Sequence, residues 1–322
     1  MLYSSIQAVS QSGHKIVLIG TSKAAPEYTV NENDFAELAV ELGCPFFCDA
    51  QINQLYYERM IEASGAEVAI SINWLTLIKQ TILDKFKYGL LNAHAGDLPR
   101  YRGNAVPNWA ILAGESEVVA TIHQMVAQLD AGPILLKRSF PLSSNSYIFD
   151  VYRFLETAIP EMFVHTLSGL ENGTIVPTPQ PEDPALALRC FPRIPQDGQI
   201  DWQLSAVEIG RLIRASAEPF AGAYSYLGDE KTIIWRAYPE SLPYSFFGVP
   251  GQVVEIRHQT GEVVVLAADG IVVLEEIETA KDGRIRPNRK IKSTRTRFGL
   301  DIAQLLERIV ILEKQITQLK EA

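Results

Sequence analysis

The stretch YGLLNAHAG, residues 88–96, is decisive for the fold, because an apolar run here ends in polar side chains and a turn. Two similar runs precede it, KIVLIGTS at 15–22 and EVAISINWL at 67–75. Between them, FAELAVELG (35–43) and LYYERMIEASG (55–65) have apolar residues at helical spacing and end in a glycine that suits a C-terminal cap. Strands that alternate with helices predict an α/β fold with a parallel sheet covered on both faces.

The polar residues of this stretch are candidate site residues. Ligands of such sheets bind beyond the carboxyl ends of the strands, where Asn92 and His94 stand. They are two residues apart, so they share one face of the strand, and with a carboxylate they would form an acyl-transfer site. Asp130 is the candidate carboxylate, since it begins a tight turn after an apolar stretch, although a turn-capping role would also explain it. His123, on the preceding strand, is interpreted as structural.

The second half of the chain differs from the first in its proline content and in its pattern of apolar residues. Five prolines in residues 178–199 predict an extended linker, and Ser205 with Glu208 forms a capping-box pattern that opens a helix to about residue 215. Short apolar runs with Gly or Asp turns follow, a pattern typical of a small β-barrel of the OB-like kind. The predicted organisation is a catalytic domain at 1–180, a linker at 181–199, a mostly β domain at 200–300 and a C-terminal helix at 301–322.

That C-terminal helix carries a heptad pattern. Large apolar residues alternate at spacings of three and four over nearly three heptads, which predicts either a coiled coil or a helix packed on its own chain. We expect a homo-oligomer. The residues of this seam are Ile302, Leu305, Ile309, Leu312, Ile316 and Leu319.

Composition restricts the class of protein. Of the 322 residues, 47% are hydrophobic and 21% charged, as in soluble globular proteins, and the formal net charge of −9 makes nucleic acid a less favoured partner. The three cysteines, Cys44, Cys48 and Cys190, lack metal-ligand spacing and are interpreted as reduced core residues; no metal is expected. No apolar segment is long enough for a membrane span and no signal peptide is seen, so a cytoplasmic protein is expected.

The motifs resemble a known family. Asn92-x-His94, the following Leu98-Pro-Arg-Tyr-Arg-Gly103 and the later Asp130-x-Gly132 are similar to the signature of the 10-formyltetrahydrofolate-dependent formyltransferases, which act on methionyl-tRNA or on nucleotide-linked amino sugars. The resemblance begins at about residue 10 and continues into the second domain, at Ile200-Asp-Trp202, Ile213-Arg-Ala215 and Pro219-Phe-Ala-Gly-Ala223. It implies a Rossmann-like first domain.

The resemblance also implies roles for individual residues. Asn92 and His94 would donate hydrogen bonds to the developing oxyanion, and Asp130 would accept the proton of the attacking amine and fix the tautomer of His94. The co-substrate would be 10-formyltetrahydrofolate, bound by the backbone of the segment 71–75 and by the loop before Asp130. The residues implied in binding it are Ser71, Ile72, Asn73, Trp74, Leu75, Leu129 and Gly132, and those implied in binding the acceptor are Arg102, Gly103 and Asn104.

Three features depart from the family pattern. Gly96 and Asp97 stand where members have a serine and an apolar residue, so a hydroxyl that would steady the loop after His94 is absent. Members begin with a strand before the first helix, whereas Met1 here opens directly into a predicted helix; we therefore expect a central strand to be missing, through a late start or a real truncation. The heptad tail is the third departure.

The acceptor amine is not specified by these motifs. Acidic charge disfavours tRNA, whose binding depends on Lys and Arg, except at residues 281–297, where eight basic residues accompany one Asp. That run could contact tRNA, a sugar-nucleotide diphosphate or only solvent. A nucleotide-linked amino sugar is the preferred acceptor; methionyl-tRNA, hydrolysis of the folate by water, and an inactive folate-binding or scaffold protein are the alternatives.

Overall fold

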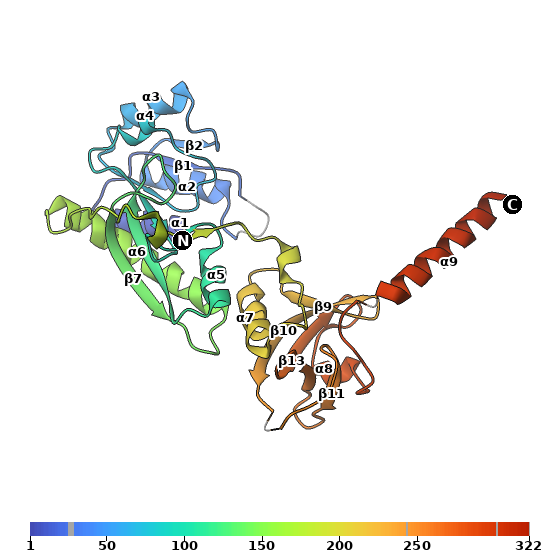
Figure 1. Cartoon of the computed structure of the whole chain (residues 1–322). Helices are drawn as coiled ribbons and strands as arrows, with labels where there is room; N and C mark the ends of the chain where they lie inside the picture. The colour runs from blue at the N-terminus through green and yellow to red at the C-terminus, as the bar shows by residue number, and fades with distance from the viewer. Residues whose placement is uncertain (25–28, 243, 301, 322) are drawn as a thin grey trace. The chain divides into compact units, whose positions relative to one another are not determined.

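The structure, a computed structural model, describes residues 1–24, 29–242, 244–300 and 302–321 (Figure 1). The chain forms two compact units. The N-terminal unit comprises residues 1–110, 115–142 and 150–192, and the C-terminal unit comprises 111–114, 143–149 and 193–322. Each unit is described by itself.

The N-terminal unit contains two separate main sheets. One pairs β1 (Ile19–Thr21) with β2 (Phe46–Cys48) in parallel. The other has the strand order β3-β4-β6-β7, in which β3 (Ala69–Ser71) and β4 (Leu90–His94) are parallel. β6 (Glu117–Gln124) runs antiparallel to β4, because the chain returns to the same end of the sheet after His94, and β7 (Ile134–Pro141) is antiparallel to β6. The prediction of one parallel sheet is therefore corrected to two sheets, the larger of them mixed.

Local sequence signals account for the helices of this unit. α2 (Glu32–Leu42) starts at a capping box formed by Asn31 and Asp34 and ends at Gly43, which has φ 67°. α3 (Leu55–Ser64) ends at Gly65 with φ 66°, so both predicted glycine caps are confirmed. The remaining helices are α1 (Leu2–Gln11), α4 (Gln80–Leu83), α5 (Val106–Ala113) and α6 (Ile148–Glu171), and a short sheet pairs β5 (Arg102–Gly103) with β8 (Arg189–Cys190).

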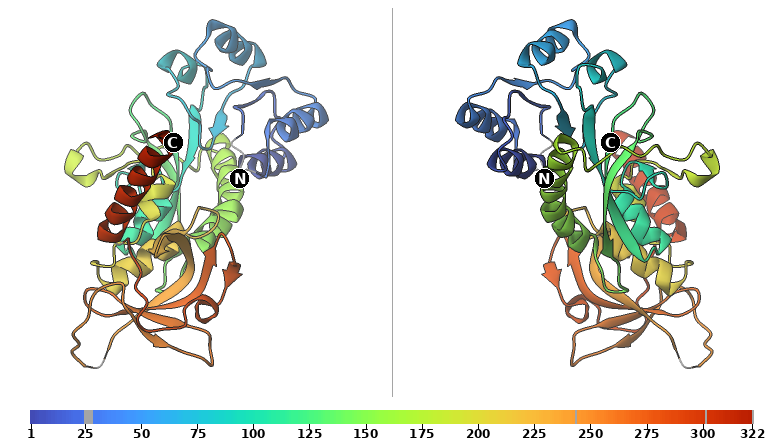
Figure 2. Two further views of the ribbon diagram at one scale, coloured as in Figure 1. Left: turned by 90° about the vertical axis from the view of Figure 1, so that its right-hand side faces the viewer. Right: turned by 90° about the vertical axis from the view of Figure 1, so that its left-hand side faces the viewer.

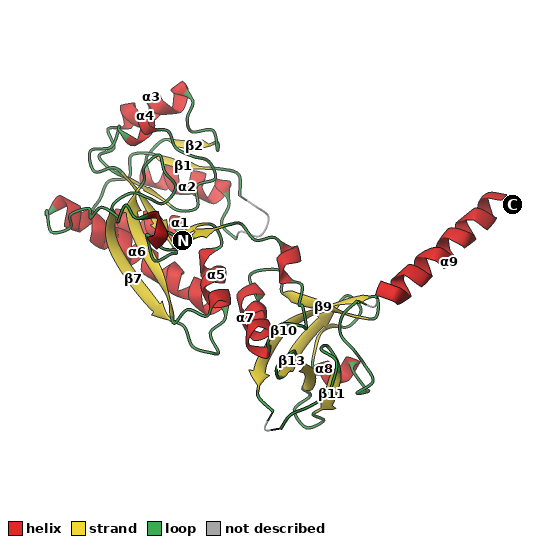
Figure 3. Ribbon diagram, in the orientation of Figure 1, coloured by secondary structure: helices red, strands yellow, loops and turns green. Residues whose placement is uncertain are grey.

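The C-terminal unit is mostly β (Figures 2 and 3). Its sheet has the order β11-β12-β13-β10-β9, with β14 paired to β13. The two ends of this sheet are joined by residues 296–299: Leu227 bridges Phe298, and Gln252 bridges Arg297. The strands are β9 (Ala223–Leu227), β10 (Glu230–Glu240), β11 (Val253–Ile256), β12 (Val263–Leu266), β13 (Ile271–Thr279) and β14 (Gly283–Ile285).

The main apolar core of this unit lies between α7 (Ala206–Ser216) and the sheet, and a smaller cluster of Val264, Leu266, Ile271 and Val273 packs separately. α7 begins at the predicted capping box of Ser205 and Glu208 and packs against β10. Ile209, Ile213 and Val265 are fully buried in the main core. The 3-10 helix η2 (Pro195–Gly198), the short helix α8 (Pro287–Lys290) and the long helix α9 (Ile302–Glu321) complete this unit, and the 3-10 helix η1 (Pro184–Leu186) lies at the end of the N-terminal unit.

The seam on α9 is open to solvent. Ile309, Leu312 and Ile316 are each about half exposed, and Leu319 is 80% exposed. The side chain of Ile302 lies outside the described part of the structure. The seam predicted either a coiled coil or a helix packed on its own chain, and the exposed side chains do not support the second prediction.

Two further sequence expectations concern cysteines and membranes. Cys190 is buried and Cys44 half-buried, but Cys48 is exposed, so the prediction of three core cysteines is wrong for Cys48. It is the last residue of the short strand β2, where an alternating side chain points away from the core. Among the described residues, no helix combines the length and apolar character that a membrane span requires.

Candidate active site

Strand register places a row of polar side chains at one end of the larger sheet. Asn92 on β4 lies opposite His123 on β6, and His94 lies opposite Thr121. On the other side of β4, Asn92 lies opposite Ser71, the last residue of β3. Because side chains alternate along a strand, Asn92, His94 and His123 share one face. All three histidine and asparagine side chains thus come from two adjacent central strands.

Asp130 reaches this row from the turn after β6. Its backbone has φ 49°, and its carboxylate Oδ2 accepts a hydrogen bond from the backbone N–H of Gly103 at 2.8 Å. The same oxygen is 3.7 Å from His94 Nδ1, and Oδ1 is 3.6 Å from His123 Nε2. With its side chain only 10% exposed, the carboxylate lies between two imidazole rings. The structure therefore brings Asn92, His94 and Asp130 together, with His123 as a fourth member.

The ring of His94 is held by a backbone carbonyl. Its Nε2 donates to the carbonyl oxygen of Tyr101 at 2.7 Å, which leaves Nδ1 facing Asp130. Gly96 makes room for this arrangement, since a Cβ at residue 96 would lie 2.5 Å from His94 Nε2 and 2.5 Å from the Tyr101 oxygen. A serine at this position would thus displace the ring from its present contact.

The loop after His94 is fixed by groups other than the missing serine hydroxyl. Thr121 Oγ1 donates to the carbonyl oxygen of Gly96 at 2.6 Å. Lys137 Nζ donates to Asp97 Oδ1 and to the carbonyl oxygen of Leu98, both at 2.6 Å. The unusual Asp97 therefore pairs with a lysine on β7, and the expected loss of loop support is compensated.

His123 orients Asn92. Its Nδ1 donates to the carbonyl oxygen of Gln124 at 2.9 Å, so in the neutral ring Nε2 accepts the Asn92 Nδ2–H at 3.3 Å. Burial, helped by the charge of His94, lowers the pKa of His123 to about 4, against the opposing effect of Asp130. One of the two N–H groups of Asn92 is engaged in this contact, and the other remains available to a substrate oxygen.

This lowered pKa predicts a pH dependence of stability. The unfolded chain binds a proton at His123 near pH 6.5, whereas the folded chain binds it only near pH 4, so the free energy of unfolding should fall as the pH is lowered between these values. We expect His123→Gln to flatten this fall, measured by chemical unfolding at a series of pH values. His165→Gln, at an exposed position of the same unit, is the control and should keep the wild-type slope. Equal slopes in both variants would contradict the assignment.

Gln180 supports the turn that carries Asp130. Its Nε2 donates to the carbonyl oxygens of Asp130 at 2.9 Å and Gly132 at 2.7 Å, and its Oε1 accepts from Arg102 at 2.7 Å. Gly132 is required sterically, because a Cβ there would lie 1.8 Å from the carbonyl oxygen of Gln124. Sequence reasoning did not identify Gln180, since a single glutamine next to a proline-rich stretch carries no local signal.

The residues implied in co-substrate binding lie near β3 and the Asp130 turn. Ser71 is buried, and its Oγ has no hydrogen-bond partner among the described residues. Asn73 has φ 54°, and Trp74 donates from Nε1 to Thr76 Oγ1 at 3.1 Å while packing against the neighbouring core. Two of these residues have exposed apolar side chains: Leu75 is 72% and Leu129 40% exposed. Ile72 is partly exposed and Gly132 is buried.

Two of the three residues implied in acceptor binding contact the turn that carries Asp130 or the glutamine that supports it. Arg102 and Gly103 form β5, in register with Arg189 and Cys190 of β8. Gly103 contacts Asp130 and Arg102 contacts Gln180, as described above, whereas Asn104 is exposed and its N–H donates to the Cys190 carbonyl oxygen at 3.1 Å. Within the described ranges, no group of three or more His, Cys, Asp or Glu side chains is positioned to hold a metal ion.

Comparison with known proteins identifies the class of this fold and site. The formyl transferase family matches residues 2–167, and the formyl transferase C-terminal domain matches residues 194–294. The first match alone spans more than half of the chain. The chain belongs to the formyl transferase family.

Three solved structures of differently named proteins share this fold. HypX from Aquifex aeolicus, in complex with tetrahydrofolic acid, is 21% identical with a TM-score of 0.58; the match covers 87% of this chain and 48% of HypX, so the chain spans about half of that protein. An N-formyltransferase from Helicobacter canadensis, in complex with folinic acid and dTDP-3-aminofucose, is 19% identical with a TM-score of 0.60, covering 84% and 94%. Methionyl-tRNA formyltransferase from Clostridium thermocellum is 17% identical with a TM-score of 0.50, covering 69% and 93%. At these identities the likeness establishes the fold.

Proposed function

We propose that the chain transfers a formyl group from 10-formyltetrahydrofolate to a primary amine, and that the amine belongs to a nucleotide-linked amino sugar. The observation that carries the proposal is the Asp130 carboxylate, buried between His94 and His123 at the carboxyl end of β4, with Asn92 oriented beside it. Formyl transfer needs a proton acceptor for the attacking amine and a donor for the formyl oxygen, and these groups provide both.

The chemistry of each side chain follows from its contacts. The folate, when bound, supplies the formyl carbon; the bond from that carbon to the folate nitrogen breaks as a bond to the amine nitrogen forms. Asp130 takes the proton that the amine loses, and its Oδ2 faces His94 Nδ1, so the proton has a second carrier for its return to the leaving nitrogen. The free N–H of Asn92 donates to the formyl oxygen as negative charge develops there.

The folate is assigned to the segment 71–75 and the Asp130 turn. Ser71 Oγ is a buried hydroxyl without a partner in the described structure, which is the kind of group that a polar heterocycle would satisfy. Asn73 follows Ser71 with φ 54°, and Leu75 of the same segment and Leu129 beside Asp130 are apolar side chains that are exposed. We therefore place the pteridine ring at the carboxyl end of β3.

A small acceptor is favoured over tRNA by the charge distribution. The net charge is −9, and the basic run at 281–297 is partly neutralised within the C-terminal unit. Arg284 pairs with Glu218 and Glu278, and Lys290 pairs with Glu230 and Asp282. Binding of tRNA depends on cations that are free to neutralise phosphates, so this run is a weak candidate for it. The dTDP-sugar bound to the Helicobacter canadensis enzyme illustrates the acceptor class.

Product analysis tests this function. The protein is incubated with 10-formyltetrahydrofolate alone, with a panel of amino-sugar nucleotides, and with methionyl-tRNA, while free tetrahydrofolate is followed. We expect release of tetrahydrofolate only with an amino-sugar nucleotide, together with an N-formylated sugar. Release without any amine would instead indicate a hydrolase, release only with methionyl-tRNA would indicate the tRNA enzyme, and no release in any arm would contradict formyl transfer to these acceptors.

A further inference from the structure

Two arginines occupy paired positions in the short sheet beside Asp130. Arg102 of β5 is in register with Arg189 of β8, so the two parallel strands bring two positive charges to the same level. Like charges in directly paired positions of a sheet lower its stability. The stability of this strand pair therefore does not explain why both positions hold an arginine.

Neither arginine has a carboxylate partner among the described residues. Arg102 donates from Nη2 to Gln180 Oε1 at 2.7 Å, and its buried Nε has no hydrogen-bond partner in that part of the chain. Arg189 is exposed, and within the described ranges its side chain makes no hydrogen bond or ion pair. The neighbouring Arg100, by contrast, pairs with Glu115 at 2.7 Å. On a chain of net charge −9, two guanidinium groups left without acidic partners indicate a site for a negative ligand.

Arg189 lies next to the candidate catalytic carboxylate. A Cβ added to Gly103 would lie 2.4 Å from Arg189 Nη1, so the guanidinium group rests against this glycine. The N–H of the same glycine donates to Asp130 Oδ2 at 2.8 Å. One residue thus separates Arg189 from the group proposed to accept the proton of the amine. An anion bound to Arg189 would belong to the molecule that carries this amine.

Phe191 orients the guanidinium group of Arg189. Its ring centroid is 5.5 Å from Arg189 Cζ, which is within the range of a cation–π contact. The carbonyl oxygen of Phe191 accepts a hydrogen bond from Trp109 Nε1 at 2.9 Å, which fixes the backbone of Phe191. The ring supplies no oxygen to the N–H groups of Arg189, so these donors are oriented but not satisfied. Phosphate oxygens accept from such a group in a bidentate geometry.

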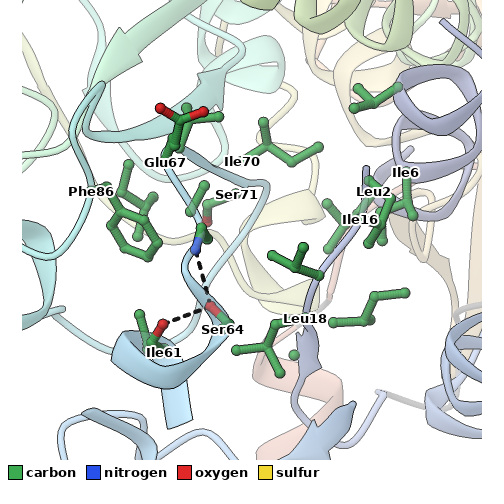
Figure 4. A pocket seen from close by; sticks show the side chains of 18 of the residues that line it. Leu2, Ile6, Ile16, Leu18, Ile61, Ser64, Glu67, Ile70, Ser71 and Phe86 are labelled. Atoms are coloured by element: carbon green, nitrogen blue, oxygen red, sulfur yellow. Dashed lines mark hydrogen bonds between the residues drawn. The ribbon is translucent and has the colours of Figure 1, made fainter. Parts of the chain in front are cut away.

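The cavity of the N-terminal unit is not an alternative site for this anion. It has a volume of about 390 Å³, and most of its lining is apolar, as Ile16 and Ile70 illustrate (Figure 4). No arginine, and neither His94 nor Asp130, is among the described residues that line it. An anion there would lose its hydration without gaining guanidinium donors. The charged part of an acceptor is therefore better matched by β5 and β8.

We propose that Arg189, oriented by Phe191, binds the phosphate groups of the acceptor and so selects a nucleotide-linked amine over a free amino sugar. This inference rests on the proposed function, since it assigns a further residue to the same site. Arg102 adds positive charge from the paired strand. The phosphates would anchor the acceptor at β8 while its amino group reaches Asp130 across Gly103. Arg189 takes no part in proton transfer, so its loss should weaken binding and not slow the chemical step.

Calorimetry with inorganic pyrophosphate tests this subsite without any transfer reaction. The full chain is titrated at low salt, beside Arg189→Gln and a matched control, Arg59→Gln, which removes an exposed arginine of α3. We expect Arg189→Gln to raise the Kd of pyrophosphate by ~10-fold or more, because a charge-assisted pair is lost, and Arg59→Gln to leave it unchanged. The same Kd in all three proteins would overturn the proposal, as would absence of binding to the wild type.

Transfer RNA is the competing source of phosphate. The wild-type and Arg189→Gln proteins are therefore also titrated with unfractionated tRNA. We expect tRNA to bind weakly and to the same extent in both proteins. Binding of tRNA that is tighter than that of pyrophosphate and is lost in Arg189→Gln would assign the subsite to nucleic acid and overturn the proposal.

Steady-state kinetics separates this inference from the proposed function. With an amino-sugar nucleotide that is formylated, Arg189→Gln should raise KM by ~10-fold or more and keep kcat near the wild-type value. The same sugar without its nucleotide should be affected far less. Arg189→Lys, which keeps the charge but not the bidentate geometry, should recover part of the loss.

The two possible failures are distinct. A fall in kcat with an unchanged KM in Arg189→Gln would overturn the inference and leave formyl transfer established. Absence of transfer with every acceptor would reject the proposed function, and the pyrophosphate titration would still decide whether Arg189 binds phosphate.

Discussion

Asp130→Asn and His94→Ala should each lower the rate of formyl transfer by ~10²-fold or more. Asparagine keeps an oxygen that can accept the Gly103 N–H, so the turn is preserved while the proton acceptor is lost. Alanine at residue 94 removes the ring that faces Asp130 at 3.7 Å. Initial rates with a saturating amine acceptor, together with circular dichroism of each variant, provide the measurement.

Two further variants separate chemistry from structure. Asp97→Asn is the control: it changes a carboxylate in the loop after His94 that is half exposed and paired with Lys137, and it should retain most of the rate. Asn92→Ala should cost less than His94→Ala if backbone donors share the developing oxyanion. A near-normal rate in Asp130→Asn or in His94→Ala, with a good acceptor, would remove that residue from the proposed proton pathway.

Deleting the chain after Leu300 should produce a smaller assembly that still transfers formyl groups. The seam of α9 leaves large apolar side chains in water, and burying each is worth about 1.5–3 kcal/mol. The opposite face suits solvent, with Glu307, Lys314, Gln315, Gln318 and Lys320 in the sequence and Arg308 paired with Asp229 at 2.9 Å. A second copy of the same helix would cover the seam, as in a coiled coil.

Sedimentation of the full-length and truncated proteins measures this effect. We expect the full chain to sediment as a dimer or larger species and the truncated chain as a lighter one, with unchanged activity per active site. A double variant, Ile309→Asn with Ile316→Asn, should reproduce the lighter species without shortening the chain, and Lys314→Gln on the opposite face should not. An identical mass for the full-length and truncated proteins would show that the seam does not mediate assembly.

Much of the site geometry was predictable from residue spacing. The two-residue spacing of Asn92 and His94 defined a shared face, and glycine caps at Gly43 and Gly65 defined where two helices end. The contact partner of Asn92 was not predictable, because it depends on the antiparallel register between β4 and β6, which brings His123 opposite Asn92. The sequence predicted one parallel sheet and not two separate ones, since periodicity describes single strands and not their neighbours.

Other features depended on distant segments. Gln180 contacts Asp130 and Arg102, which lie 50 and 78 positions earlier in the chain, and no local sequence pattern predicts such a contact. The loop after His94 was expected to lose support, yet Lys137 on β7 provides it through Asp97 and Leu98. Exposure of Cys48 likewise depends on which side of β2 faces the core. In each case tertiary contacts, not propensity, decide the outcome.

The segment that joins the two ends of the C-terminal sheet also decides where the chain can be cut. Phe298 is buried, and its N–H donates to the Gly251 carbonyl oxygen at 2.8 Å; the Gly299 N–H donates to the Tyr226 carbonyl oxygen at 2.9 Å. A truncation that tests the role of α9 must therefore keep Gly299, because a cut a few residues earlier would remove hydrogen bonds that hold the two ends of the sheet together. If α9 mediates the proposed assembly, the assembling helix begins only three residues after this joining segment, so a force on α9 would act directly on the closure of the second domain.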